Sequence, residues 1–472
     1  MRIYRSFLQI LSISLLLCSP LYFCAEKNEN FLYPELKGPL IEVDNAQINV
    51  HIVAHTHDDI GWLKTLDEYY LTSEKKVSPL GVQYILDSIF PVLSSDPNKK
   101  FIYVEIGFFQ RWWNEQNEAT KTIVRKLVQN GQFEFINGGY CMNDEATVYY
   151  EDSIDQMYLG HKFLLDTFNV IPTVGWHIDP FGHAAAQASL FAQMGFTSFF
   201  VCRLDYQDKY NRLKNQAMEM LWVPNTSQGV ENAIFTHVNY YEYGSPPNFD
   251  FDILETDQPI QDNPNLQGYD VPQRADEFVA WFKLMQSNYK SSHLMHTAGE
   301  DFHYMAAQVN YKNYDKLFNY IQKNPSYNTK IIYSTPSQYI KTIFPLGISY
   351  PYKYDDFFPY ANVVDGYWTG YFTSRPAFKG LVRREGKLLQ AAKRLFTQLV
   401  WEKSSQYVTK NFAKIDQAMY KLEEAMAIGQ HHDAVTGTER QLVAENYKLR
   451  YAIGENAVKQ VIIRKFLCVY RK

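Results

Sequence analysis

One stretch near the start of the chain, "HTHDDIGWLKT", holds four side chains that can bind a metal ion: His55, His57, Asp58 and Asp59. The apolar run "INVHIVA" precedes it directly. On an extended strand, side chains two residues apart share a face, so the two histidines and Asp59 would point one way and Asp58 the other. An imidazole beside a carboxylate on a rigid strand end makes half of a zinc site. The same residues could instead form a hydrogen-bonded structural cluster, and strand geometry does not choose between His55 and His57.

A second stretch, "GWHIDPFGH", places an aspartate at the end of another apolar run. Asp179 precedes Pro180, which keeps it in an extended conformation. Its carboxylate could ligate a metal or act as a nucleophile. The alternative is that it only caps a helix expected to begin near Ala184.

A third stretch, "AGEDFHY", pairs Glu300 with Asp301 after a further apolar run. Neighbouring carboxylates at the edge of a site repel each other, which raises the pKa of one of them, as a general acid requires. The alternative is a solvated loop with two ordinary acids.

The fourth stretch, "IGQHHDAVTGT", follows a helical pattern. Gly429 suits the C-terminal cap of that helix, which would place His431, His432 and Asp433 in a loop. Adjacent side chains point in different directions, so we expect at most one of the two histidines in the same site. A charge role at the helix end is the alternative.

The elements that must position these residues predict a parallel α/β arrangement. From about residue 48 to 334, short apolar runs alternate with amphipathic stretches. The runs are "INVHIVAH", "FIYVEIGFF", "FEFINGGY", "TVGWHIDPFGH", "SFFVCRLDY", "LMHTAGEDF" and "KIIYST". Strands that are apolar on both faces and separated by helices indicate a mostly parallel sheet or a barrel with flanking helices, and the sequence fits either. In both architectures ligands bind at the carboxyl ends of the strands. We therefore expect the polar stretches to converge on one site.

The sequence pattern changes after about residue 340. A Tyr-, Pro- and Phe-rich connector leads into three long patterns with apolar residues at three- and four-residue spacing, which predict a three-helix bundle. We assign residues 45–340 to an α/β catalytic domain. Residues 341–472 are assigned to the connector and the helical bundle.

Composition excludes some partners. The chain of 472 residues has a formal net charge of −5 and no basic stripe, so neither nucleic acid nor an anionic membrane is expected as its main partner. Aromatic residues make up 16%; they could line a carbohydrate site, although many will be core.

The first 25 residues have the pattern of a secretory signal peptide. Arg2 and Arg5 precede an apolar run that the polar "EKNEN" ends, although a short membrane anchor is the alternative. No later stretch offers about 18 uninterrupted apolar residues, so we expect no stable membrane insertion once the leader is removed.

If the chain enters the secretory pathway, asparagine glycosylation and disulfide formation become possible. Asn225 begins the glycosylation acceptor "NTS". The mature chain would keep Cys141, Cys202 and Cys468. This odd number allows one disulfide, and the sequence does not choose the pair.

The four polar stretches, in this order, resemble the class II α-mannosidases, glycoside hydrolase family 38. "HTHDDIGWLKT", "RLDYQDK" and "HHDAVTGT" are most similar to the lysosomal branch, and the likeness runs from about residue 47 to 460. The resemblance implies one Zn²⁺ per chain. Its ligands would be His57, Asp59, Asp179 and, from the helical part, His432.

The same resemblance implies a mechanism that retains anomeric configuration. Asp179 would be the nucleophile as well as a metal ligand, and Asp301 the acid/base. Zinc would bind the vicinal hydroxyls of the sugar. Four further residues would shape the mannose pocket: Trp62, Phe181, Arg203 and Asp433.

The implied function is exo-hydrolysis of terminal α-D-mannose from N-glycans or oligomannosides, in the lysosome or after secretion. Two departures from the family appear. Ala184 stands where the family usually has serine, and the chain is about half the family's length, which predicts a C-terminal truncation without the family's β-rich domains. The alternatives are an inactive truncated paralogue or mannose-binding remnant, and a metal-dependent carbohydrate deacetylase. The sequence does not indicate linkage specificity, pH optimum or oligomeric state.

Overall fold

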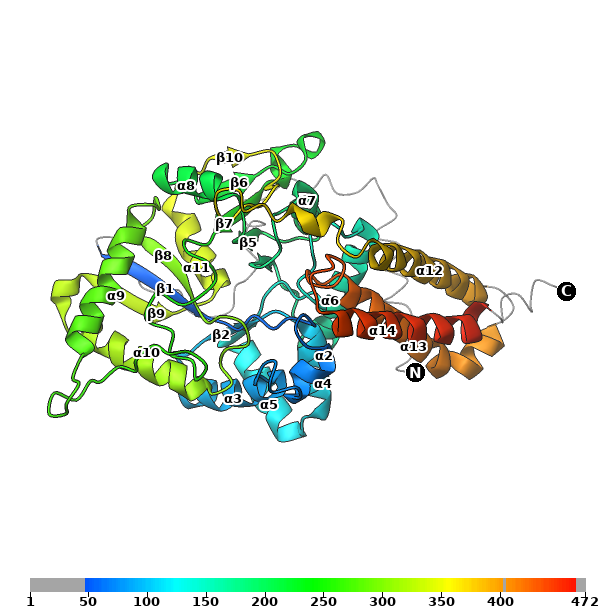
Figure 1. The fold of residues 1–472 in the computed structure, drawn as a ribbon, viewed down its shortest axis with the longest axis horizontal. Coiled ribbons are helices and arrows are strands. Elements are labelled where there is room, and N and C mark those ends of the chain that lie inside the picture. The colour runs from blue at the N-terminus through cyan, green and yellow to red at the C-terminus, as the bar shows by residue number, and fades with distance from the viewer. Residues whose placement is uncertain (1–46, 402–404, 464–472) are drawn as a thin grey trace. The chain divides into compact units, whose positions relative to one another are not determined.

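The computed structural model describes residues 47–401 and 405–463. The predicted signal peptide and Cys468 lie outside the described residues. Within them, the elements follow the predicted order of alternating strands and helices and then long helices (Figure 1).

The "HTHDD" stretch continues the central strand of a three-stranded parallel sheet. The order of the sheet is β8 (His293–Ala298), β1 (Ile48–Ala54) and β9 (Thr329–Tyr333). All seven residues of β1 are buried, because the strand has a partner on each side and helices pack against the sheet. Figure 1 shows helices α9 (Val271–Gln286) and α10 (Ala307–Gln322) beside it.

A five-stranded sheet carries the "GWHIDPFGH" stretch. Its order is β10 (Tyr352–Lys353), β6 (Glu219–Trp222), β7 (Ile234–Val238), β5 (Ser198–Val201) and β4 (Val174–His177). Every pair is parallel except β6 with β7. The sheet therefore agrees with the mostly parallel arrangement that the sequence predicts.

A two-stranded parallel sheet lies in line between the other two. It pairs β2 (Phe101–Tyr103) with β3 (Phe133–Phe135). A single bridge joins His55, just after β1, to Ile102 of β2. On the other side the Asn137 amide, just after β3, donates to the Val174 carbonyl of β4. A few contacts thus connect the three sheets, since the Trp176 amide also donates to Asn137 Oδ1 at 3.3 Å. The carboxyl ends of β1 and β4 face a common region.

The remaining helices of the α/β part connect these strands. They are α2 (Leu66–Leu71), α3 (Val82–Ser95), α4 (Ile106–Glu115), α5 (Glu118–Gln129), α6 (Tyr150–Phe168), α7 (Ala185–Gln193), α8 (Tyr206–Lys214) and α11 (Pro336–Ile343).

Two details of the strand prediction are wrong. The run "FIYVEIGFF" is not one strand, because β2 ends at Tyr103 and α4 begins at Ile106. A short apolar run does not distinguish a buried strand from a buried helix. The sequence also did not indicate β6 and β7. Glu219 and His237 interrupt their apolar pattern, and these two residues face each other across the antiparallel pair, with His237 Nδ1 3.1 Å from Glu219 Oε1.

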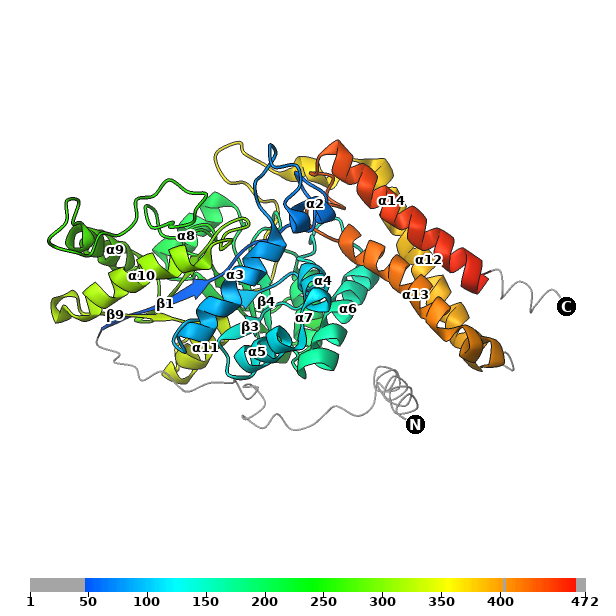
Figure 2. The ribbon, with the colours of Figure 1, turned by 90° about the horizontal axis from the view of Figure 1, so that it is seen from below.

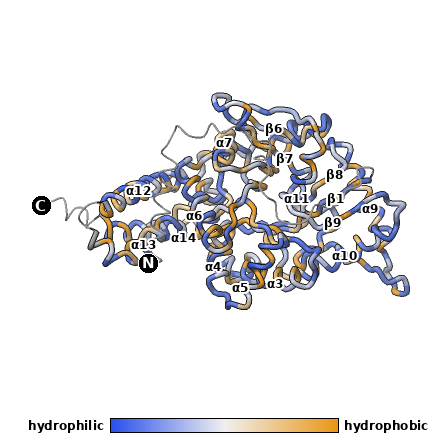
Figure 3. The backbone as a smooth tube through the Cα atoms, turned by 180° about the vertical axis from the view of Figure 1, so that it is seen from behind, coloured by the Kyte–Doolittle hydropathy of each residue, from blue (hydrophilic) through white to orange (hydrophobic). Residues whose placement is uncertain are grey.

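Three long helices follow, as predicted, and pack against one another. They are α12 (Pro376–Trp401), α13 (Ser405–Gly429) and α14 (Gln441–Val458), which continues as a π-helical turn (Lys459–Ile463). Figure 2 shows them side by side. In Figure 3 hydrophilic and hydrophobic residues alternate along them, as expected for amphipathic helices. No helix in residues 47–401 and 405–463 has the length and apolar character that crossing a membrane requires.

Candidate active site

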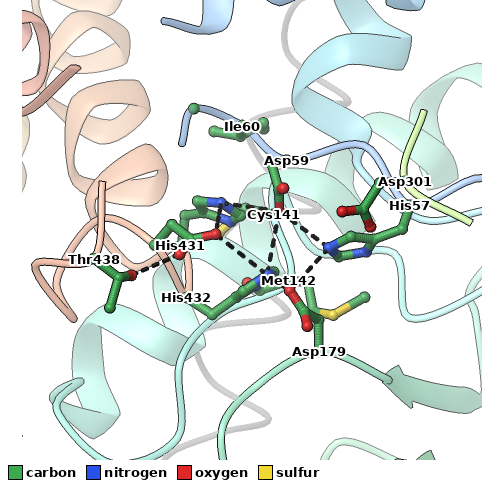
Figure 4. Close-up of polar contacts among 12 residues, drawn as sticks. His57, Asp59, Ile60, Cys141, Met142, Asp179, Asp301, His431, His432 and Thr438 are labelled. Carbon is green, nitrogen blue, oxygen red and sulfur yellow. Dashed lines mark hydrogen bonds and ion pairs between the residues drawn. The ribbon is translucent and has the colours of Figure 1, made fainter. Parts of the chain in front are cut away.

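Four buried side chains from three distant parts of the chain meet at the strand ends. His57 and Asp59 follow β1, Asp179 follows β4, and His432 follows α13. One ligand atom from each lies within 4.8 Å of all the others. Figure 4 shows the four side chains pointing toward one another. This group can hold a metal ion.

The spacing of the four atoms matches a tetrahedral site. His57 Nε2 lies 3.0 Å from Asp59 Oδ1 and 3.3 Å from Asp179 Oδ2. His432 Nε2 lies 3.3 Å from Asp59 Oδ1 and 2.8 Å from Asp179 Oδ2. Ligands about 2.0–2.1 Å from a tetrahedral ion would be ~3.3 Å apart. The chain therefore already has the spacing that an ion of this size requires.

The hydrogen bonding of His432 also favours a cation. Its Nδ1 lies 2.8 Å from the carbonyl oxygen of Met142 and must carry the proton in that contact. Nε2 faces Asp179 Oδ2 at 2.8 Å. Burial lowers the pKa of His432, but Asp179 and Asp59 outweigh burial and raise it well above its usual range, so this nitrogen carries a proton when no metal ion is bound. A metal ion would take the place of that proton. The buried Nε2 of His57 and Oδ1 of Asp59 also have no hydrogen-bond partner. A metal ion would satisfy all of these atoms.

Negative charge dominates the electrostatics of the site, as two of the four groups show. Burial lowers the pKa of His57, but the adjacent Asp59 carboxylate outweighs burial and raises it well above its usual range. Burial raises the pKa of Asp179, but Arg203 and His432 outweigh it and hold that pKa well below its usual range. The site therefore keeps its carboxylates ionised, which is the charge that a divalent cation requires.

His55 and Asp58, the other two residues of "HTHDD" that could bind a metal, face away from the metal-binding group of His57, Asp59, Asp179 and His432. His55 Nε2 lies 2.8 Å from the Tyr243 carbonyl oxygen. Asp58 accepts hydrogen bonds from Thr56 Oγ1 and Tyr103 Oη, each at 2.8 Å. His55 and Asp58 therefore make structural hydrogen bonds, whereas His57 and Asp59 face the site.

The histidine pair after α13 differs from the simple expectation. Both rings reach Asp59, since His431 Nε2 lies 3.4 Å from Asp59 Oδ1 and the two ring centroids are 4.2 Å apart. Helix α13 ends close to the predicted position, but Gly429 is its last helical residue and has no positive φ, so it is not a left-handed cap. Gly429 is needed there because a Cβ would lie only 2.0 Å from Tyr451 Oη.

Glu300 and Asp301 are partly buried, and they do not behave as two solvated acids. Burial raises the pKa of Asp301 to about 7, and Asp59 and Asp179 add to the shift. Burial and the Asp301 charge raise the pKa of Glu300 to about 8. Figure 4 shows Asp301 beside His57. A carboxyl group in this position can hold a proton near neutral pH.

Tyr243 joins the two carboxylates that the family resemblance pairs. Its Oη lies 3.1 Å from Asp301 Oδ1 and 3.4 Å from Asp179 Oδ1. The two carboxylate oxygens can be no farther apart than these distances together. That limit leaves room for the ~5–5.5 Å between carboxyl groups that is typical of retaining glycosidases. Neither motif nor spacing indicated Tyr243 in the sequence.

The predicted pocket residue Arg203 forms an ion pair with Asp179. Four aromatic rings surround its guanidinium carbon at 5.1–5.9 Å, namely Phe181, Tyr243, Tyr360 and Trp368. Arg203 is therefore part of the site and does not form an ordinary ion pair at the surface. Tyr360 and Trp368 come from the aromatic connector, which the sequence did not place at the site.

The other predicted pocket residues lie around the same loops. The Phe181 ring meets the His432 ring edge-on, with centroids 6.0 Å apart. Asp433 Oδ1 accepts a hydrogen bond from Thr438 Oγ1 at 2.6 Å. The carbonyl oxygen of Trp62 accepts from the Arg440 amide at 3.0 Å, which ties the first stretch to the loop after α13.

Asp179 does not cap helix α7, so that alternative is wrong. The N-cap residue is Ala184, without a side-chain cap. Its amide donates instead to Glu145 Oε2 at 2.7 Å, a residue to which the sequence assigned no role.

Two further sequence predictions concern residues outside the metal-binding group. Cys141 and Cys202 are both free, buried thiols, so a bridge between these two is excluded. Asn225 lies at the start of a short 3₁₀ turn and is partly exposed, as glycosylation would require.

Comparison with known proteins places the chain in a family. Residues 47–363 match the "Glycosyl hydrolases family 38 N-terminal domain" and residues 366–466 the "Alpha mannosidase middle domain". The chain is 47% identical over 429 residues to the lysosomal alpha-mannosidase of Dictyostelium discoideum, covering 91% of this chain and 42% of that protein. The human lysosomal alpha-mannosidase is 44% identical, with 87% and 41% covered. The chain thus spans about two fifths of the length of these relatives.

A solved structure shows the same fold. The crystal structure of an alpha-mannosidase from Enterococcus faecalis superposes with a TM-score of 0.66 at 15% identity, covering 90% of this chain and 43% of that one. At this identity the likeness concerns the fold alone. The family match over most of the chain, together with the relatives above 40% identity, shows that the chain belongs to glycosyl hydrolase family 38, the class II α-mannosidases.

Proposed function

We propose that this chain carries the catalytic site of a zinc-dependent, retaining exo-α-mannosidase that removes terminal α-D-mannose from N-glycans or oligomannosides. The observation that carries the proposal is the pair Asp179 and Asp301, linked by Tyr243, beside a buried group of two histidines and two aspartates. The lysosomal alpha-mannosidases among its relatives support mannose as the sugar.

The chemistry divides between the two carboxylates. Asp179, held ionised by Arg203 and His432, attacks the anomeric carbon. Asp301, whose pKa of about 7 lets it carry a proton, donates that proton to the leaving oxygen. Asp301 then removes a proton from the water that releases the sugar from Asp179.

The metal site would contribute binding and charge. His57, Asp59, Asp179 and His432 would hold Zn²⁺, which when bound supplies a Lewis acid for the sugar hydroxyls. A two-histidine, two-carboxylate donor set of this spacing suits zinc, although other divalent ions share the preference for it. Arg203 and its aromatic neighbours would orient the sugar beside Asp179. Trp62 and Asp433 would complete the pocket.

The experiment is hydrolysis of a chromogenic α-mannoside by the purified full chain, with added zinc and with a chelator. Release of the chromophore that the chelator abolishes and zinc restores would support the proposal. Release that a chelator leaves unchanged would overturn the metal dependence. Binding of mannose without any hydrolysis would instead favour a mannose-binding protein.

Localisation follows from the same reasoning. We propose entry into the secretory pathway and delivery to the lysosome or secretion, because of the leader pattern and the lysosomal relatives. Glycosylation at Asn225 would accompany that route, and loss of a mass increment in Asn225→Gln would test it.

A further inference from the structure

One buried carboxylate outside the metal-binding group makes three hydrogen bonds to the segment that carries Asp179. Glu145 Oε1 lies 2.8 Å from Nδ1 of His177 and 2.8 Å from Nδ1 of His183. Its other oxygen, Oε2, accepts the Ala184 amide at 2.7 Å. The side chains of Glu145 and both histidines are 0% exposed.

These contacts close the base of the Asp179 loop. His177 is the last residue of β4, and His183 comes just before the N-cap residue of α7. Asp179 lies between them, on a turn in which Gly182 has φ +103°. A single carboxylate therefore holds both ends of the loop at one point, and the loop between them has little freedom to move.

The same segment also holds His432. The Met142 carbonyl oxygen lies 2.8 Å from His432 Nδ1 and accepts the His432 amide at 3.3 Å. The Asp144 amide donates to the Gln430 carbonyl at 2.9 Å. Residues 142–145 thus contact His432 itself and the two ends of the loop that carries Asp179. Asp179 and His432 are 253 positions apart in the chain.

The chemistry requires Glu145 as a carboxylate. Both oxygens accept hydrogen bonds, so an ionised carboxylate satisfies all three donors, whereas a carboxamide has only one accepting oxygen. Burial raises the pKa of Glu145, but His183 and His177 outweigh burial and lower it to about 2. The carboxylate in turn fixes the Nδ1–H tautomer of both histidines.

We propose that Glu145 is a positioning residue for Asp179, holding its loop through His177, His183 and the Ala184 amide so that the Asp179 carboxylate stands where the metal ion requires it. This role rests on the metal site of the proposed function. The hydrogen bonds of the Glu145 side chain go to His177, His183 and the Ala184 amide and to none of the four metal-binding side chains, so it acts through the loop.

The test is Glu145→Gln in the full chain. The amide must present its NH₂ group either to the two histidine donors or to the Ala184 amide, so the loop shifts. We expect Zn²⁺ affinity, measured by competition with a chromophoric chelator, to fall about 10-fold. We also expect the visible spectrum of the Co²⁺-substituted protein to change, since it reports ligand geometry. Loss of fold stability alone would not alter the spectrum of the bound ion.

A matched control is available on strand β6. Glu219 on β6 is also a buried carboxylate that contacts a histidine, His237 Nδ1 at 3.1 Å, and it accepts a hydrogen bond from Tyr339. Both donors reach Oε1, so Glu219→Gln keeps their acceptor and removes only a buried negative charge. It should leave Zn²⁺ affinity and the Co²⁺ spectrum as in the wild type.

The outcomes separate the two proposals. Wild-type chain that binds no metal would overturn the metal site itself. Wild-type chain that binds metal, with Glu145→Gln equal to it in affinity and spectrum, would overturn the positioning role alone. If Glu145→Gln does not fold, His183→Asn and His183→Leu replace it. Asparagine keeps a donor at the position of Nδ1 and leucine removes it, so weaker metal binding in the leucine variant only would support the role, and equal binding would overturn it.

Discussion

Two pairs of buried histidines have different surroundings. One member of each pair comes from strand β1 or from the segment that directly follows it. His57 and His432 meet beyond the end of β1, with ring centroids 5.2 Å apart. His51, inside β1, contacts His293 of the neighbouring strand β8 at 3.0 Å and Ser334 Oγ at 2.8 Å. Both pairs are removed from solvent.

Carboxylates decide the difference between the two pairs. Asp59 and Asp179 lie within 3.3 Å of the first pair, and they outweigh burial, so the pKa of His57 is well above its usual range. In the second pair burial dominates, and the pKa of His51 falls to about 3 and that of His293 to about 4. Buried histidines without carboxylates therefore stay neutral, whereas two adjacent carboxylates let such a pair hold positive charge, as a proton or as a metal ion.

The comparison depends first on Asp179, which should be both a metal-binding residue and the nucleophile. Asp179→Asn keeps the size of the side chain and removes its negative charge. We expect turnover of a chromogenic α-mannoside to fall by about 10⁴-fold or more, because the covalent step is lost. Some stability should also be lost, because Arg203 loses its buried ion-pair partner, so the fold of the variant is checked by circular dichroism. Turnover within tenfold of the wild type would contradict the nucleophile assignment.

The acid/base role of Asp301 is the next largest effect. Asp301→Asn cannot donate a proton, so hydrolysis of a mannoside with a poor leaving group should fall about 10²–10⁴-fold. A dinitrophenyl mannoside, whose leaving group needs no proton, should lose much less. Equal losses on both substrates would show that Asp301 has another role.

Matched substitutions in the two histidine pairs test the comparison itself. His57→Asn removes a metal-binding atom, so metal affinity should fall by more than the ~10–100-fold typical of an outer partner. His51→Asn leaves His293 Nδ1 without its partner, which should cost about 1–3 kcal/mol of unfolding free energy and leave metal affinity unchanged. Chelator competition and chemical denaturation measure the two quantities. Metal affinity that fell equally in both variants would break the distinction.

The smallest effect concerns acid. The folded-state pKa of His51 is about 3, below the ~6.5 of an exposed histidine, so below pH ~6.5 the unfolded state binds more protons. Keeping His51 neutral costs no free energy of unfolding above pH ~6.5. As the pH falls toward 3 the free energy of unfolding decreases, by about 2 kcal/mol at pH 5. His51→Asn should shrink the difference in unfolding free energy between pH 7 and pH 5 by that amount. An unchanged difference would show that His51 is not held neutral.

Much of the fold was predictable from local patterns. Doubly apolar runs separated by amphipathic stretches predicted the parallel strands, and three- and four-residue spacing predicted α12, α13 and α14. The errors arose where a short apolar run began a buried helix, as at Ile106, or where buried polar residues such as Glu219 and His237 interrupted a strand. In both cases tertiary burial overrode the local pattern.

By itself, the sequence determined the residue types at the strand ends and their order along the chain, since "HTHDD", "DPFGH", "GED" and "HHDA" are local features that strand and helix boundaries make visible. Only the tertiary structure decided which of these side chains meet. It selected His57 over His55, placed Tyr243 between the two carboxylates, and tied the Asp179 loop to Glu145. These choices depend on contacts between segments far apart in the chain, and the geometry of such contacts is set by packing, which no local spacing encodes.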